Sequence, residues 1–347
     1  MHTARNSVLV IGISLAVFTG CGSEPSSSLR AAPGTCGSGG AVSGRPINVV
    51  TTVAPITSIV ANIAGGTGAN VTGIVPEGTN SHTFEPPPSA AEAMATADVV
   101  FINGLGLEDP TQELAEANMP KSAEVCQLGT TTLPEKDWIY DFSFPKEGGK
   151  PNPHLWTNPP MVKGYAGVVR DTLVKRDPAN AASYEKNYTA FAARVDALDA
   201  AMATATATLP RSDRKLLTYH DAYAYFALHY GWDVIGAIQP SSFDQPTPKE
   251  VADLIEQIRD QKVKAIFGSE VFPSPVLEQI GAESGTRYVD VLRDDDLVGE
   301  PGDPEHSWMG LMRFDYVTMI ESLGGDASAL KSLDVSDVVI DTAKYPQ

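Results

Sequence analysis

Short apolar runs alternate with stretches of helical periodicity along most of the chain. In the first half, strand-like runs cover residues 47–52 (INVVTT), 71–75 and 98–104, and helical patterns cover 55–65 and 90–97. Strands that alternate with helices are typical of a parallel sheet whose faces are covered by helices. The first half is therefore predicted to form an α/β lobe.

The second half repeats this pattern. Strand-like runs cover 215–219, 232–236, 264–268 and 287–292, and helical patterns cover 221–230, 251–258, 274–283 and 307–323. The same reasoning predicts a second α/β lobe.

A long amphipathic stretch lies between the two halves. Its apolar positions recur at spacings of three and four, as expected for one face of a helix: Tyr184, Tyr188, Phe191, Val195, Leu198 and Met202. The pattern predicts a helix of about 25–30 residues that begins near Asp177-Pro178 and ends near Leu209-Pro210. We expect this helix to connect the lobes stiffly, with boundaries at 46–160 for the first lobe, 161–210 for the helical segment and 211–347 for the second lobe.

The first 21 residues have the features of a signal peptide. Arg5 supplies a positive charge, and residues 8–18 (VLVIGISLAVF) form an apolar segment too short to span a bilayer as a stable helix. The ending FTGC resembles a lipobox, which predicts that Cys21 carries the lipid of a mature lipoprotein. An ordinary signal peptide with an incidental cysteine is the alternative.

Residues 22–45 are rich in Gly, Ser and Pro and have no apolar periodicity, so we expect a flexible tether. The chain has three cysteines. If Cys21 is lipidated, Cys36 and Cys126 remain in an oxidising compartment, where a disulfide between them would fix the tether to the first lobe. The sequence leaves this pairing open.

Composition narrows the classes of function. The 347 residues carry a formal net charge of −18, and the isoelectric point is near 4.6. Nucleic-acid binding needs clustered Lys and Arg, so no nucleic-acid partner is expected. An acidic surface weakly favours cationic ligands.

Three histidines share a setting near strand ends or in loops rich in Pro and Gly. His82 follows the strand 71–75, His154 precedes a helical pattern at 160–176, and His220 follows the strand 215–219. In open α/β sheets the carboxyl ends of the strands form the ligand crevice, and neutral imidazole is a common ligand of zinc-like ions. The three side chains therefore predict a metal site.

A closed tetrahedral site needs a fourth ligand. The acidic run 294–296 (DDD) follows the strand 287–292, and one of its carboxylates would complete the set; a solvated acidic turn is the alternative. Of the other histidines, His229 is interpreted as structural, and His306 is a reserve ligand.

Four motifs in order carry a family resemblance. NSHTFEP, NPHLWTNP, YHDAYAYF and a late Asp resemble the metal-binding receptors (solute-binding lipoproteins) of zinc and manganese ABC importers, cluster A-I. The resemblance spans nearly the whole mature chain and implies two α/β lobes, a long backbone helix and a metal in the cleft between the lobes. It implies His82, His154, His220 and one Asp as ligands. The family's Asp-small-Leu pattern selects Asp295, with Asp294 as the next choice.

The resemblance also bears on the cargo. In this family, His at the position of His220 goes mainly with zinc and Glu with manganese, which implies Zn²⁺, with Mn²⁺ or iron as alternatives. Glu85 and Asp221 are near enough in sequence to accept the second ring N–H of a ligand imidazole. Trp156 and Phe84 are expected to shape the cleft wall.

These features predict an extracytoplasmic, lipid-anchored monomer at the outer face of the cytoplasmic membrane. It would capture a divalent metal and deliver it to an ABC permease with its ATPase, and it would not be an enzyme. A secreted zinc hydrolase would need an open coordination position and a general base, and the sequence has neither HExxH nor GxSxG. A surface adhesin, or a siderophore receptor with a basic cleft, are further alternatives.

Overall fold

The computed structural model describes residues 36–238, 247–269 and 275–346. The predicted signal peptide, Cys21 and the tether as far as residue 35 lie outside the described residues. Within the described residues, each helix is too short or too polar to span a membrane.

The first lobe is a four-stranded parallel sheet in the order β2-β1-β3-β4. Its strands are β1 (Asn48–Thr51), β2 (Asn70–Gly73), β3 (Val99–Ile102) and β4 (Glu124–Gln127), and its helices are α1 (Ala54–Ala64), α2 (Pro88–Thr96), α3 (Asp109–Asn118) and α4 (Leu128–Thr132). Of these elements, β1, β2, β3, α1 and α2 were predicted from the apolar patterns of the sequence. α3 and β4 were not predicted, because DPTQELAEAN and EVCQ are too polar to show an apolar period.

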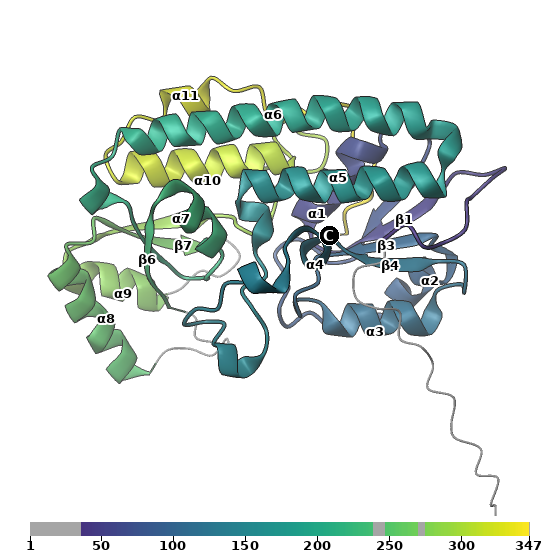
Figure 1. The fold of residues 1–347 in the computed structure, drawn as a ribbon. Coiled ribbons are helices and arrows are strands. Elements are labelled where there is room, and N and C mark those ends of the chain that lie inside the picture. Colours follow the sequence, from purple (N-terminus) through teal and green to yellow (C-terminus); the bar gives the residue numbers. More distant parts are fainter. Residues whose placement is uncertain (1–35, 239–246, 270–274, 347) are drawn as a thin grey trace, which may run out of the picture. The chain divides into compact units, whose positions relative to one another are not determined.

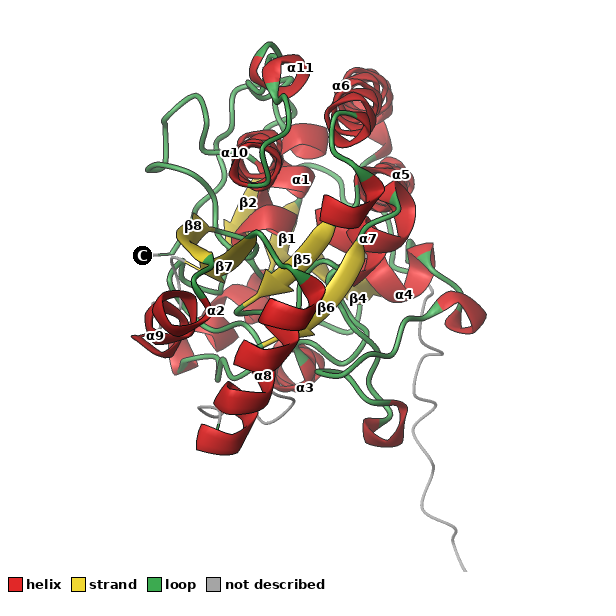
Figure 2. Ribbon diagram, turned by 90° about the vertical axis from the view of Figure 1, so that its left-hand side faces the viewer, coloured by secondary structure: helices red, strands yellow, loops and turns green. Residues whose placement is uncertain are grey.

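The second lobe is also a four-stranded parallel sheet, in the order β6-β5-β7-β8. Its strands are β5 (Lys215–Thr218), β6 (Asp233–Ala237), β7 (Ala265–Ser269) and β8 (Arg287–Leu292), and its helices are α7 (Ala224–Tyr230), α8 (Pro248–Gln261), α9 (Pro275–Ser284) and α10 (Trp308–Ser322), followed by the short α11 (Ser328–Lys331). Figures 1 and 2 show α8 and α9 below the strands and α10 above them. A capping box, in which Thr247 and Glu250 exchange hydrogen bonds, begins α8.

Two helices lie between the lobes in the sequence: α5 (Pro159–Arg176), which packs on the first lobe, and the longer α6 (Ala181–Ala207), which spans both lobes (Figure 1). Near its start, α6 is bonded to the first lobe, because Asn187 donates to the carbonyls of Ile63 and Gly65. Near its end it is bonded to the second lobe, because Thr206 accepts from the indole of Trp232. The predicted fold class, two parallel-sheet lobes joined by a long helix, is confirmed.

Both lobes share most of one core. A single cluster of buried apolar side chains runs from β1 and α1 through α5 and α6 to α10, whereas a smaller cluster lies under α8 and α9. The end of the chain also returns to the first lobe, where Lys344 forms a parallel bridge with Thr72. This return was not predicted from the sequence, from which all of 211–347 was expected to belong to the second lobe.

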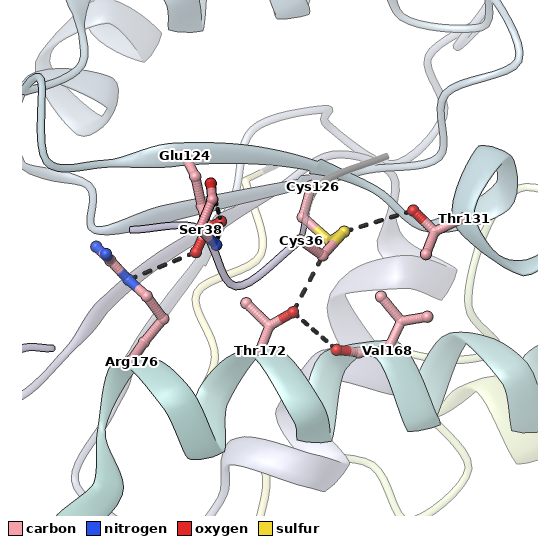
Figure 3. The surroundings of a disulfide bond; sticks show 8 residues. All are labelled: Cys36, Ser38, Glu124, Cys126, Thr131, Val168, Thr172 and Arg176. Atoms are coloured by element: carbon pink, nitrogen blue, oxygen red, sulfur yellow. Dashed lines mark hydrogen bonds and ion pairs between the residues drawn. A yellow bond between two sulfur atoms is a disulfide. The ribbon is translucent and has the colours of Figure 1, made fainter. Parts of the chain in front are cut away.

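The segment after residue 35 is fixed to the first lobe by a disulfide between Cys36 and Cys126 (Figure 3). Ser38 donates to Glu124 through its backbone N–H and its hydroxyl. Gly39 lies so close to the buried guanidinium of Arg176 that a Cβ would stand 1.7 Å from Nη1. Residues 36–39, which were predicted to belong to a flexible tether over 22–45, thus contact the first lobe, and glycine allows this backbone to pack where a side chain would clash.

Removal of this cross-link should destabilise the protein. The disulfide joins residues 90 apart in the sequence, and closing such a loop restricts the unfolded chain, so Cys36→Ala is expected to lower the free energy of unfolding by about 2–4 kcal/mol. Urea unfolding of residues 22–347 measures this loss. Reduced wild type should match the variant. Equal stability of oxidised wild type and Cys36→Ala would contradict the prediction.

Candidate metal centre

Four side chains predicted from the sequence meet at the carboxyl ends of the strands. His82 lies in the loop between β2 and α2, and His154 precedes a short 3₁₀ turn, Leu155–Thr157. His220 follows β5, and Asp295 follows β8. One donor atom from each lies within 4.8 Å of the others. The two lobes thus contribute two residues each to one cluster.

The imidazoles converge through their Nε2 atoms. His82 Nε2 lies 3.0 Å from His154 Nε2 and 3.0 Å from His220 Nε2. Ligand nitrogens around a tetrahedral zinc with bonds of about 2.0–2.1 Å stand roughly 3.3 Å apart, so these separations are close to those of a metal-bound set.

Two rings of the cluster are oriented through the nitrogen that faces away from it. His154 Nδ1 lies 2.8 Å from Asn152 Oδ1, and His220 Nδ1 lies 2.8 Å from Asp294 Oδ2. An amide oxygen and a carboxylate are acceptors, so each Nδ1 carries the proton and donates it. In a neutral ring, Nε2 then presents its lone pair to the cluster.

The three aspartates of the acidic run have different positions. Asp295 belongs to the cluster: its Oδ2 accepts from the Ser81 hydroxyl at 2.8 Å, and its Oδ1 is buried without a hydrogen-bond partner among the described residues. Asp294 contacts His220 instead, and Asp296 accepts from the backbone N–H of Gly78. A buried carboxylate oxygen without a partner is costly unless a cation balances it. The geometry therefore favours Asp295 over Asp294 as the fourth donor.

The structure gives the two orienting contacts it describes to residues other than Glu85 and Asp221, which were predicted for this role. Glu85 is exposed, and the nitrogens of His154 and His220 that face away from the cluster contact Asn152 and Asp294. Proximity in sequence failed as a guide, because the acceptor for His220 comes from a loop 74 residues away. No sequence signal identified Asn152, although it lies two residues before a ligand.

The remaining predicted residues have other environments. His229 contacts Asp199 on α6 at 2.8 Å, away from the cluster. His306 is buried, with its Nε2 3.8 Å from Glu77, and it does not belong to the cluster. Trp156 is fully buried beside His154, and its indole donates to the carbonyl of Asp294. Phe84 is half-buried and packs against the large core cluster.

Phe144 is a site residue that the sequence analysis missed. Its ring centroid lies 5.6 Å from that of His82 and 5.7 Å from that of His154. It lines a cavity of about 330 Å³ that reaches His82 and also includes Lys150, Leu105 and Leu107. A lone Phe in a loop bounded by prolines belongs to no motif, so its place over the ligands follows from the tertiary structure.

Burial and charge divide the histidines into two classes. Burial lowers the pKa of His82 and of His154 well below the ordinary value, and the nearby His220 lowers both further. For His220, burial also acts downward, but Asp295 and Asp294 outweigh it and raise the pKa to about 9. At neutral pH without metal, His82 and His154 are therefore neutral, and His220 carries a proton that a metal must displace.

Comparison with known proteins gives the family. A family model described as ZnuA, zinc-uptake complex component A, periplasmic, matches residues 49–322. This chain belongs to that family. The resemblance to metal-binding receptors of ABC importers, stated above from four motifs, is confirmed.

Relatives in the family carry names that refer to different metals. The chain is 30% identical over 280 residues to the iron-binding protein YfeA of Yersinia pestis, covering 81% of this chain and 87% of that protein. It is 28% identical over 320 residues to the manganese-binding lipoprotein MntA of Halalkalibacterium halodurans, covering 90% and 97%. The periplasmic zinc-binding protein TroA of Treponema pallidum superposes with a TM-score of 0.72 at 26% identity, covering 81% and 99%. Membership of the family thus leaves the identity of the metal open.

The pKa of His220 predicts how metal binding depends on pH. With a pKa of about 9, His220 must lose a proton on binding, so zinc affinity should rise about tenfold per pH unit between about pH 7 and pH 8.5. Competition with a chelator of known pH dependence measures this slope. His229→Ala, which changes an imidazole outside the cluster, should leave the slope unchanged. An affinity that levels off above about pH 7 would contradict the assignment.

Phe144 should control how fast a metal exchanges. Its ring packs beside His82 and His154 and lines the cavity that reaches His82, so Phe144→Ala is expected to speed metal dissociation severalfold while one metal per chain is still bound. Stopped-flow transfer of the metal to a chelator measures the rate. Phe84→Ala is the matched control, because Phe84 is a half-buried phenylalanine that does not line this cavity. Unchanged dissociation from Phe144→Ala would contradict a role in exchange.

Proposed function

We propose that this protein is an extracytoplasmic receptor that captures one Zn²⁺ with His82, His154, His220 and Asp295 and delivers it to an ABC importer. The observation that carries this proposal is the convergence of three imidazole nitrogens and the carboxylate of Asp295, which has one buried oxygen without a hydrogen-bond partner among the described residues. Such a set of donors is costly without a cation and well matched to one.

The donor set favours zinc over manganese. Three nitrogens and one carboxylate suit zinc, whereas manganese prefers more oxygen ligands, and affinities at such sites rise from manganese to zinc. The relatives named for iron and manganese make those ions the competing cargoes.

A carrier fits the site better than a hydrolase. Four protein donors fill a tetrahedral shell, whereas a catalytic zinc keeps a position for water. Orienting contacts from Asn152 and Asp294 fix two of the rings, as expected for a site that holds its ion.

The same proposal covers location and partners. Lipid on Cys21 would anchor the chain at the outer face of the cytoplasmic membrane, and residues 22–35 would join the anchor to the body fixed by Cys36. MntA is named a lipoprotein, which supports this arrangement. The receptor would act as a monomer, with residues 46–160 and 211–347 as its two main lobes, and would dock on a permease served by an ATPase.

Metal analysis of purified residues 22–347 tests the cargo. Wild type and His229→Ala should each retain one zinc per chain after dialysis, and His220→Ala should lose it or bind far more weakly. His229 is the matched control because its imidazole contacts Asp199 rather than the cluster.

Competition among Zn²⁺, Mn²⁺ and Fe²⁺ then separates the alternatives. Tighter binding of manganese or iron would overturn zinc as the cargo and keep the receptor. If wild type binds none of these three ions stoichiometrically, the metal-capture proposal itself is wrong.

A further inference from the structure

One face of α10 contacts the segments that carry three of the four proposed ligands. The indole of Trp308 donates to the carbonyl of Trp156 at 2.9 Å, and the hydroxyl of Tyr316 donates to the carbonyl of Thr157 at 2.5 Å. Both bonds end in the turn that follows His154. The third contact is made by Asp315, which bonds both the turn that carries Asp295 and the segment after His220.

Asp315 is fully buried and accepts three hydrogen bonds. Its Oδ1 accepts from the backbone N–H of Arg293 at 3.0 Å. Its Oδ2 accepts from the backbone N–H of Asp294 at 3.1 Å and from the hydroxyl of Tyr223 at 2.8 Å. One carboxylate thus joins the turn that carries Asp295 to the segment that follows His220.

The turn at Asp294 needs such an acceptor. Asp294 has φ of 36°, in the left-handed region that residues with a Cβ seldom occupy. Its buried N–H would lack a partner without Asp315, and its carbonyl accepts from Trp156. With both sides of this residue bonded, the Asp294 side chain meets His220 Nδ1, and the next side chain, Asp295, enters the cluster.

We infer that Asp315 is a positioning residue for the metal centre. It does not touch the ion: it fixes the left-handed turn from which Asp295 and Asp294 take opposite tasks, one as ligand and one as acceptor for His220. This inference rests on the proposed metal-binding function. The competing interpretation is that Asp315 stabilises the fold without affecting the site.

Asp315→Asn tests the inference. The amide has nearly the same shape but presents an NH₂ group where a backbone N–H must be accepted, so the turn should lose its geometry. We expect zinc affinity about 10- to 100-fold weaker than that of wild type, the range typical when a partner behind a ligand is lost. Titration with Co²⁺ should in addition give a visible spectrum with altered intensity, because Co²⁺ absorption reports coordination geometry.

Asp98→Asn is the matched control. Asp98 is also a buried carboxylate that accepts a backbone N–H, from Asn48, but it lies just before β3, at the end of the sheet opposite the cluster. This variant should unfold at lower temperature and keep wild-type zinc affinity and Co²⁺ spectrum. Together the two variants separate loss of stability from loss of positioning.

Two outcomes with Asp315→Asn would overturn the inference. Wild-type affinity with reduced stability would leave Asp315 a purely structural role. Weaker affinity with a wild-type Co²⁺ spectrum would assign the effect to the lost negative charge and not to position.

If Asp315→Asn does not fold, hydrogen exchange of the wild-type amides tests the inference instead. The amides of 293–294 should be protected before any metal is added, because Asp315 already holds them; fast exchange that slows only with metal would refute the inference. Wild type that binds no stoichiometric metal would instead refute the proposed function, so the two failures are distinguishable.

Discussion

The requirement to balance four converging donor groups, three of them buried, governs the arrangement of this molecule. Three imidazole nitrogens and the Asp295 carboxylate point at one another across about the distance that a single cation would bridge. Without a cation, the charge is balanced by a proton on His220, whose pKa is raised to about 9. The site thus holds either a proton or a metal, and each must displace the other.

The spacing of the donor atoms in the cluster depends on how rigidly the two lobes are joined. The long helix α6 is bonded to α1 near one end and to the second lobe near the other, and the large core cluster continues from lobe to lobe. A continuous core resists shear because close-packed side chains have few alternative arrangements. Histidines from different lobes can therefore meet, with the Nε2 atoms of His82 and His220 3.0 Å apart.

The cluster also shows how two neighbouring residues acquire different tasks. Asp294 and Asp295 are chemically the same, yet one contacts the back of His220 and the other faces the donors. The left-handed backbone of Asp294, bonded through Asp315 and Trp156, sets this division. The family pattern pointed to Asp295, but only the backbone direction in the folded chain explains why Asp294 contacts His220 and Asp295 faces the donors.

The sequence by itself determined the α/β class, most of the elements with clear apolar periods, the long connecting helix and the residues of the donor cluster. Periodicity reports which face of an element is buried, and strand ends report where loops converge, so both are visible locally. The tertiary structure alone decided the remainder: the polar elements α3 and β4, the contacts of 36–39 with the first lobe, the return of Lys344 to β2, and the partners Asn152 and Asp294 behind two of the imidazoles. Each of these depends on contacts between residues distant in sequence, whose distances and directions are fixed only when the chain has packed.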